Sequence, residues 1–184
     1  MGKLVYWMNA SIDGYIENSD GRLDFMEPPE DFHEAANDLM RRTAALLFGR
    51  RLYEAMERPW TVDFDKENAS PVEQEFARLY RERPRYVFSD TLRTAPDGVT
   101  IVRREDAASV VTRLKQEFDG PIQVGGPDLA ASLLHLIDEF ALFTFPVVIG
   151  SGRPYLPVGE PLRLQPVEHR VLASGVTYTR HVRA

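Results

Sequence analysis

Two junctions, in each of which a buried strand runs into glycine and then into a helix, constrain the fold more than any other feature of this sequence. The apolar run 44–48 leads into Gly49 and a helix that starts at Arg50. The short run 121–124 leads into a glycine pair and a helix over 128–136. Strands that alternate with helices in this way predict an α/β fold with a mostly parallel, buried sheet.

The other segments extend the same alternation. Helical spacing of apolar residues predicts further helices over 30–42, from the capping box at Ser70 onward, and over 106–118. Residues 9–28 and 57–69 are expected to be irregular. The remaining strands are expected at 3–8, 85–89, 100–103 and 140–149, and in a hairpin of 162–173 and 176–183 closed by Ser174-Gly175. We therefore expect one domain over 1–184, with eight strands, helices on both faces and an antiparallel C-terminal hairpin.

The composition and the motif content exclude several classes of function. The chain has no cysteine, which excludes disulfides, a thiolate nucleophile and cysteine-ligated metals. His33-Glu34 begins like a zinc-binding H-E-x-x-H motif, but Asn37 stands where the second histidine belongs, so we expect no metal site. The net charge of −6 and the lack of any block of basic residues argue against nucleic acid as a partner.

The N-terminal segment gives no sign of a membrane or secretory segment. Its apolar run, residues 4–8, is too short for a signal peptide or a membrane span. We expect a cytoplasmic protein that has no membrane partner.

The two glycine junctions are the natural places for an anionic ligand. Open α/β sheets bind ligands beyond the carboxyl ends of their strands, where glycine turns and helix N-termini expose backbone N–H groups. Gly49 with Arg50 and Arg51 would suit a phosphate, and Gly125-Gly126 would suit a pyrophosphate. The G-x-G-x-x-G fingerprint, the phosphate-binding loop of nucleotide triphosphatases and the G-x-S-x-G elbow of serine hydrolases are all absent.

Five short motifs in order carry a family resemblance. They read MNASIDGYI at 8–16, LFGRRLYE at 47–54, VGGPDL at 124–129, LIDEF at 136–140 and PVVIGSG at 146–152. This pattern resembles the dihydrofolate reductase-like family, specifically the C-terminal reductase domain of the riboflavin-biosynthesis bifunctional deaminase-reductase and its stand-alone relatives. The resemblance covers nearly the whole chain and implies a three-layer αβα fold that binds NADPH.

The resemblance also implies roles for single residues. Gly49, Arg50 and Arg51 would meet the phosphates of NADPH, and Ser89 the region of the adenosine 2′-phosphate. The pyrophosphate would lie on Gly125 and Gly126, and the nicotinamide would be flanked by Asn9, Ala10 and Ile16.

Hydride transfer also needs a proton for the neighbouring heteroatom of the substrate. Asp13 matches the acidic residue of the family's Ser-Leu/Ile-Asp-Gly motif, so it is predicted to be the catalytic polar or acid–base group. Asp31, Glu34 and Asp38 on the helix 30–42 are alternatives, because folate reductases place a carboxylate on this helix.

The substrate stays open at this point. Riboflavin-pathway reductases usually have an acidic residue directly before the glycine pair, and this chain has Val124. We expect an NADPH-dependent reductase of a small heterocyclic or carbonyl substrate, related to 5-amino-6-(5-phosphoribosylamino)uracil reductase. The alternatives are a dihydrofolate or pterin reductase, and a non-catalytic nucleotide-binding homodimer. The long apolar run 140–149 also suggests a homodimer.

Overall fold

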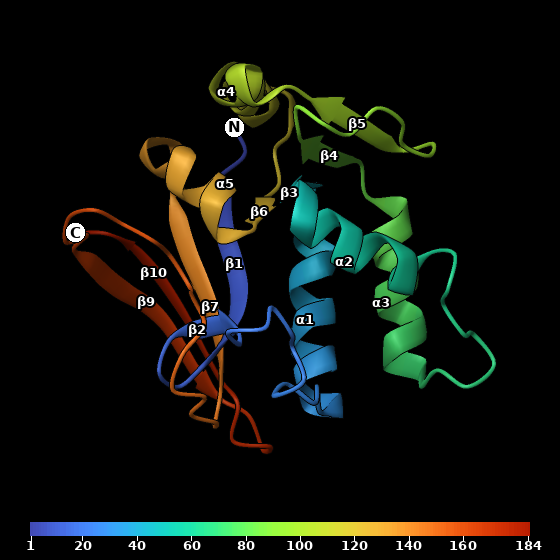
Figure 1. Ribbon diagram of the computed structural model, residues 1–184, viewed down its shortest axis with the longest axis vertical. Coiled ribbons are helices and arrows are strands. Elements are labelled where there is room, and N and C mark those ends of the chain that lie inside the picture. Colours follow the sequence, from blue (N-terminus) through green and yellow to red (C-terminus); the bar gives the residue numbers. More distant parts are fainter.

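One eight-stranded sheet carries residues from near both ends of the chain (Figure 1). The computed structural model describes residues 1–184. The strand order is β5-β4-β3-β6-β1-β7-β10-β9, parallel from β5 to β7 and antiparallel from β7 to β9. The strands are β1 (Leu4–Ser11), β3 (Ala45–Gly49), β4 (Arg85–Phe88), β5 (Val99–Val102), β6 (Ile122–Gly125), β7 (Glu139–Phe145), β9 (Leu164–Val171) and β10 (Thr177–Arg183). The expected mixed sheet with a C-terminal hairpin is confirmed.

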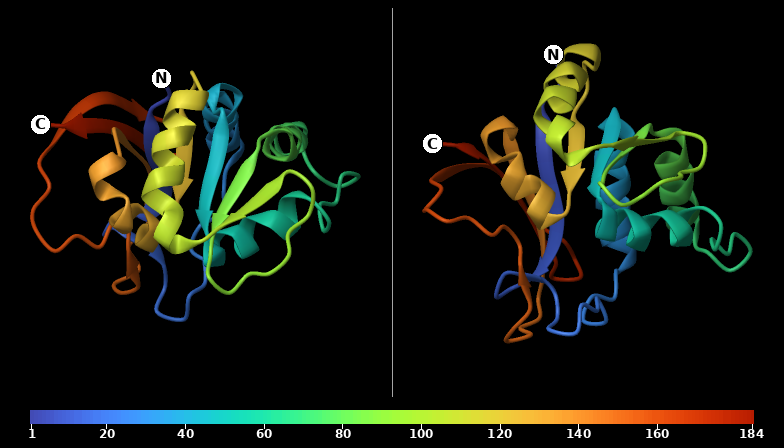
Figure 2. Two further views of the ribbon diagram at one scale, coloured as in Figure 1. Left: turned by 90° about the horizontal axis from the view of Figure 1, so that it is seen from above. Right: turned by 45° about the horizontal axis from the view of Figure 1, so that its top comes forward.

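Helices cover both faces of this sheet. In Figure 2, α1 and α4 lie on opposite sides of the strands. Helices α1 (Glu30–Arg42), α2 (Arg50–Trp60) and α3 (Pro71–Glu82) pack on one face; α4 (Ala107–Glu117) and α5 (Pro127–Ser132) pack on the other. Two 3₁₀ turns, η1 (Arg104–Asp106) and η2 (Leu134–Leu136), flank this second layer. None of the helices combines the length and the apolar character that crossing a membrane would need.

Burial on both faces explains why the central strands are apolar throughout. Along β3, Leu46 and Phe48 join the core beneath α1, α2 and α3. Ala45 and Leu47 join the core beneath α4 and α5. Neighbouring side chains of a strand point to opposite faces, so a strand buried on both sides needs an unbroken apolar run.

Several boundaries differ from those expected. Helix α2 continues to Trp60 through Pro59, and residues 15–17 form a short strand β2 (Tyr15–Glu17) that pairs with β8 (Arg153–Pro154). The helix expected over 128–136 ends at Ser132, and a 3₁₀ turn follows it.

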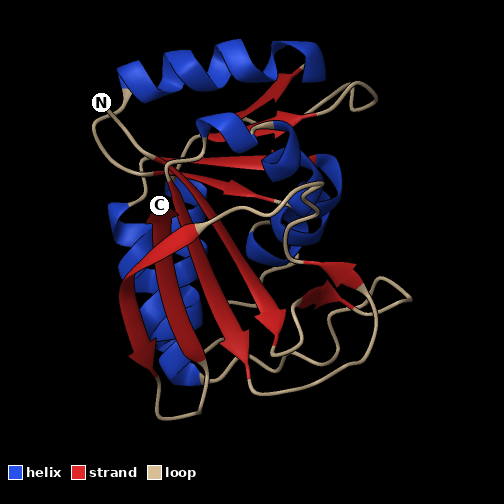
Figure 3. Cartoon of the chain, turned by 90° about the vertical axis from the view of Figure 1, so that its left-hand side faces the viewer, coloured by secondary structure: helices blue, strands red, loops and turns tan.

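Strand β7 ends at Phe145, four residues before the end of the apolar run. It lies inside the sheet, between β1 and β10. Figure 3 shows the long strands of the sheet side by side. Phe140, Ala141, Phe143 and Phe145 are buried within the chain itself. The apolar character of β7 is therefore explained without a second copy, and the homodimer stays a prediction.

Candidate active site

The carboxyl ends of the parallel strands open into one cavity of about 710 Å³. Strands β3 and β6 are neighbours, with Phe48 opposite Gly125, so the two glycine turns follow side by side. A Cβ atom on Gly126 would lie 3.8 Å from the backbone nitrogen of Gly49, and both glycines line the cavity. The two turns, far apart in sequence, therefore meet at one site.

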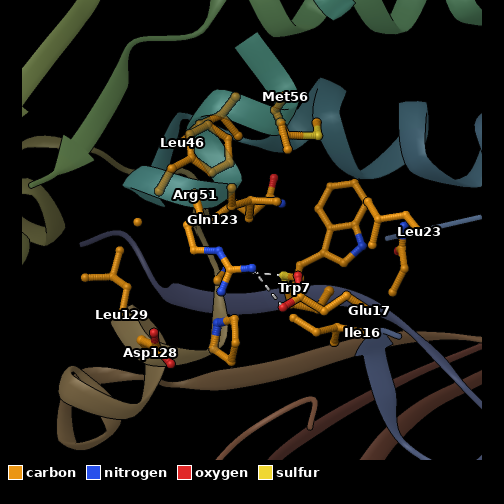
Figure 4. A pocket seen from close by; sticks show the side chains of 18 of the residues that line it. Trp7, Ile16, Glu17, Leu23, Leu46, Arg51, Met56, Gln123, Asp128 and Leu129 are labelled. Atoms are coloured by element: carbon orange, nitrogen blue, oxygen red, sulfur yellow. Dashed lines mark hydrogen bonds and ion pairs between the residues drawn. The ribbon is translucent and has the colours of Figure 1, made fainter. Parts of the chain in front are cut away.

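The charged groups that line this cavity are mainly cationic. Four arginines and two carboxylates contribute, so the wall carries a formal charge of plus two. In Figure 4, Glu17 and Ile16 lie beside Trp7, and Asp128 and Leu129 lie on the other side of the cavity. The charged residues are Glu17, Arg50, Arg51, Arg104, Asp128 and Arg153. A cationic concave wall favours an anionic ligand.

Two of these arginines are held by carboxylates. Arg51 Nη2 lies 3.2 Å from Glu17 Oε1, and Arg153 Nη1 lies 3.6 Å from the same oxygen. Arg153 also donates a hydrogen bond to Asp128, and its interactions with the Asp128 and Glu17 carboxylates raise the pKa of its guanidinium. These pairs connect β2, α2, β8 and α5 around the mouth of the cavity.

The other two arginines are better placed to receive a phosphate. Arg50 Nε is 3.8 Å from Glu54 Oε1, a loose contact within one helix, and the Arg104 side chain forms no ion pair. Sequence reasoning missed Arg104. The available signal was its position just after β5, at the same edge of the sheet as Gly49.

Six of the predicted cofactor-binding residues line the cavity. They are Asn9, Ile16, Gly49, Arg50, Arg51 and Gly126. The side-chain oxygen Oδ1 of Asn9 is buried without a hydrogen-bond partner, as is Oε1 of Gln123, which also lines the cavity. Buried polar atoms are normally paired, so both oxygens mark places where a bound ligand has a hydrogen bond to make.

The other three lie outside the cavity wall, so their predicted contacts are not supported. Ala10 is fully buried in the sheet. Gly125 packs against α2, where an added Cβ would lie 2.5 Å from Leu52 Cδ2. The Ser89 hydroxyl accepts hydrogen bonds from the N–H groups of Thr91 and Leu92, which turns it into the β4–β5 loop. Phe88 lines the cavity at this strand end instead.

Helix α5 contributes less than the sequence suggests. It has only six residues, and its first residue, Pro127, has no N–H group. The Gly126 N–H donates to Met8 Sδ at 3.2 Å. The backbone donors at this edge are therefore those that open α2 next to Gly49.

Asp13 lies outside the cavity. Its exposed carboxylate accepts hydrogen bonds from the N–H groups of Gly150, at 2.8 Å, and Ile149, at 3.3 Å. The Ser11 hydroxyl and these two N–H groups hold the pKa of Asp13 below its usual range. An ionised carboxylate that joins two loops does not fit the predicted proton donor; it fits a positioning residue.

Replacing Asp13 with alanine is expected to loosen the loop 146–152 and leave most of the catalytic rate intact. Amide exchange at Ile149 and Gly150 should accelerate by roughly tenfold or more, because both N–H groups lose their acceptor. Hydrogen exchange followed by mass spectrometry measures this change. Unchanged exchange together with loss of turnover would instead restore Asp13 as the acid.

The three alternative carboxylates on α1 do not line the cavity either. Asp31 accepts a hydrogen bond from the Ser174 N–H at 2.8 Å, Asp38 pairs with Arg41, and Glu34 is exposed. The residues of α1 that line the cavity are Phe32, His33, Ala36 and Met40. No carboxylate of this helix reaches the site.

Comparison with known proteins gives a consistent result over nearly the whole chain. A family model described as the RibD C-terminal domain matches residues 3–178. The uncharacterized protein YyaP of Bacillus subtilis (strain 168) is 28% identical over 180 residues, covering 95% of this chain and 91% of that protein.

Solved structures share the fold at lower identity. A putative riboflavin biosynthesis protein from Shewanella sp. PV-4 superposes with a TM-score of 0.73 and 23% identity, covering 99% of each chain. The dihydrofolate reductase of Enterococcus faecalis, solved in complex with NADP(H), superposes with a TM-score of 0.65 and 13% identity. That match covers 99% of this chain and 96% of the reductase.

Proposed function

The chain belongs to the RibD C-terminal domain family, and on that premise we propose that it is an NADPH-dependent reductase of a small heterocyclic or carbonyl substrate. One observation carries the proposal: the two glycine turns and four arginines line a single cavity at the carboxyl edge of the sheet. A dinucleotide needs such a surface, because its phosphates are anionic and its rings are flat.

The residues of the cavity fit this cofactor. The N–H groups that open α2, together with Arg50, Arg51 and Arg104, would hold the phosphates. The side chains of Asn9 and Ile16 would lie against the nicotinamide, with the unpartnered Asn9 oxygen available to its carboxamide. Reduced nicotinamide, when bound, supplies a hydride, and the protein has to orient the two rings and exclude water.

A proton must follow the hydride onto the substrate, and the cavity offers few groups for this step. Glu17 and Asp128 are paired with arginines, so their carboxylate oxygens are already engaged. The Tyr80 hydroxyl donates to Glu57 at 2.9 Å. Arg104 and His33 are the titratable side chains of the lining without an ionic or hydrogen-bonded partner, and because a guanidinium stays protonated, His33 is the one that can exchange a proton.

The alternatives are less well supported. A folate reductase needs a carboxylate on α1 that faces the site, and the cavity-lining residues of α1 include none. A non-catalytic nucleotide-binding homodimer would bind NADPH without hydride transfer to any acceptor. Absence of NADPH oxidation with a panel of pterins, pyrimidines and quinones would favour that alternative.

Titration with NADPH and NADH tests the proposal directly. We expect NADPH to bind more tightly, and the Arg50→Ala change to weaken its binding roughly tenfold, since a charge-assisted hydrogen bond contributes about 1.5–3 kcal/mol. Arg51→Ala and Arg104→Ala are compared in the same assay. The variant that loses the preference for NADPH over NADH locates the 2′-phosphate.

Arg113→Ala is the matched control. Arg113 is an exposed arginine on α4 that lies 3.7 Å from Glu117 one helical turn away, much as Arg50 faces Glu54, and it does not line the cavity. The Arg113→Ala change should leave the affinities for NADPH and for NADH unchanged. Wild-type protein that binds neither nucleotide would contradict the proposal.

A further inference from the structure

The end of the cavity away from the arginines is built from aromatic rings. Phe32 and His33 of α1, Trp60 of α2 and Phe76 of α3 all line it, and we call these four side chains the aromatic end. The Trp60 and Phe76 ring centres are 4.6 Å apart, and the His33 ring is 6.2 Å from Trp60 and 6.4 Å from Phe76. A flat ring is the natural occupant of such a site, because aromatic groups pack edge to face or in offset stacks at these spacings.

Flexible apolar side chains extend along the cavity wall, and two of them, Met40 and Met56, lie on the helices α1 and α2 that also carry rings of the aromatic end. Four of the five methionines in the chain line the cavity, as do both of its tryptophans. Methionine adapts its shape to irregular ligands and makes favourable contacts with aromatic rings. The methionines are Met8, Met26, Met40 and Met56.

No charged side chain lines this end of the cavity. The charged lining residues come from β2, the first turn of α2, η1, α5 and β8, and none comes from α1 or α3. A substrate phosphate or glutamate tail would have no cation here, and a protonated pterin would have no carboxylate. Burying an unpaired charge is costly, so these surroundings favour an uncharged ligand.

His33 is the polar exception within this apolar wall. The residue is 9% exposed, and Nδ1 is buried without a hydrogen-bond partner. Burial lowers its pKa, an effect only partly opposed by Glu73, which is engaged in the cap of α3. A neutral imidazole donates one hydrogen bond and accepts another, and a ligand in the cavity can satisfy what the protein leaves open.

We propose that the aromatic end binds the substrate, and that this substrate is an uncharged, flat, conjugated carbonyl compound whose oxygen accepts a hydrogen bond from His33. The inference rests on the proposed function and specifies its substrate class. Reduction of such a carbonyl takes one hydride from NADPH at the conjugated carbon system and one proton at oxygen, and it leaves NADP⁺.

The probe for this proposal is 1,4-naphthoquinone, because the chain has no cysteine thiol with which a quinone could react. Binding is followed by isothermal titration, and by fluorescence of Trp7 and Trp60, which both line the cavity. We expect the quinone to bind more tightly than either uridine 5′-phosphate or methotrexate. Tighter binding of either charged compound would overturn the assignment of substrate class.

Variants of His33 test its role. His33→Phe keeps the aromatic packing and should weaken quinone binding roughly tenfold, since one neutral hydrogen bond contributes about that much. His33→Gln retains a donor and should stay within about threefold of wild type. His135→Phe is the control, because His135 is exposed and lies outside the cavity lining. Equal affinity of wild type and His33→Phe would remove His33 from the proposal.

Two further measurements keep the outcome clear. The imidazole ¹⁵N signals of wild-type protein, which has four histidines, should show a shift for His33 when quinone is added; no shift contradicts the contact even if a variant fails to fold. NADPH is titrated in parallel. Quinone binding without NADPH binding would refute the proposed function alone, and NADPH binding without quinone binding would refute this inference alone.

Discussion

Replacing Glu57 with glutamine should lower the free energy of unfolding by about 3 kcal/mol, a large share of the stability of a small domain. The Glu57 and Arg85 side chains are 10% and 5% exposed, and Arg85 Nε lies 3.1 Å from Glu57 Oε2. The change leaves a buried guanidinium without its counter-charge. We expect the lower end of the range for a broken buried pair, because Arg85 Nη1 keeps the carbonyl oxygens of Tyr80, Arg81 and Arg83 as acceptors.

Urea unfolding of wild type and variant measures this difference. Glu54→Gln is the matched control, since Glu54 lies on the same helix but is half exposed and only loosely paired with Arg50; its effect should stay within about 0.5 kcal/mol. Equal destabilisation by the two changes would contradict the argument. The double change Glu57→Leu with Arg85→Met should cost less than Glu57→Gln, because it leaves no buried charge unpaired.

This ion pair also affects the site. Tyr80, which donates to Glu57, and Met56, which precedes it, both line the cavity. Glu57 therefore joins α2, α3 and β4 directly behind the cavity wall. Loss of the pair should increase the mobility of Trp60, three residues further along α2.

The sequence predicts the layers and the glycine turns well, because both follow from local rules. The periodicity of apolar residues along the sequence identifies strands and helices, and a glycine after a buried strand marks a turn. The capping box of α3 is present as expected, with the Ser70 N–H 2.8 Å from Glu73 Oε2. The adjacency of β3 and β6, which brings Gly49 and Gly126 together, depends on long-range pairing that no local pattern encodes; here it follows from the family resemblance.

Side-chain direction in the loops is what the sequence does not determine. Ser89 follows a strand at the sheet edge that carries the cavity. Its hydroxyl, however, accepts hydrogen bonds from the N–H groups of Thr91 and Leu92 in the local turn. Asp13 lies in the expected loop. Its carboxylate accepts a hydrogen bond from the loop 146–152, which is distant in sequence. His33 lies on the buried stripe of α1 with Ala36 and Met40. Only the cavity lining of the folded chain shows that this stripe also faces the candidate site.

Replacing Gly126 with valine should weaken NADPH binding about a hundredfold or more, the loss expected when one or two charge-assisted hydrogen bonds disappear. A Cβ at this position would lie 3.8 Å from Gly49 N and 3.8 Å from Leu52 Cβ. The two γ-methyl groups would extend further over the N–H groups that open α2. An anion would then be kept from the backbone donors that the cavity presents to it.

Backbone strain must be separated from this steric effect, because Gly126 has a φ of +95° and valine disfavours that region. Gly175→Val is the matched control: its φ is +87°, it closes the β9–β10 hairpin, and it does not line the cavity. Both variants should lose about 1–2 kcal/mol or more of stability to the same strain. Only Gly126→Val should lose the nucleotide, so equal NADPH affinities of the two variants would place the phosphates away from the junction of β3 and α2.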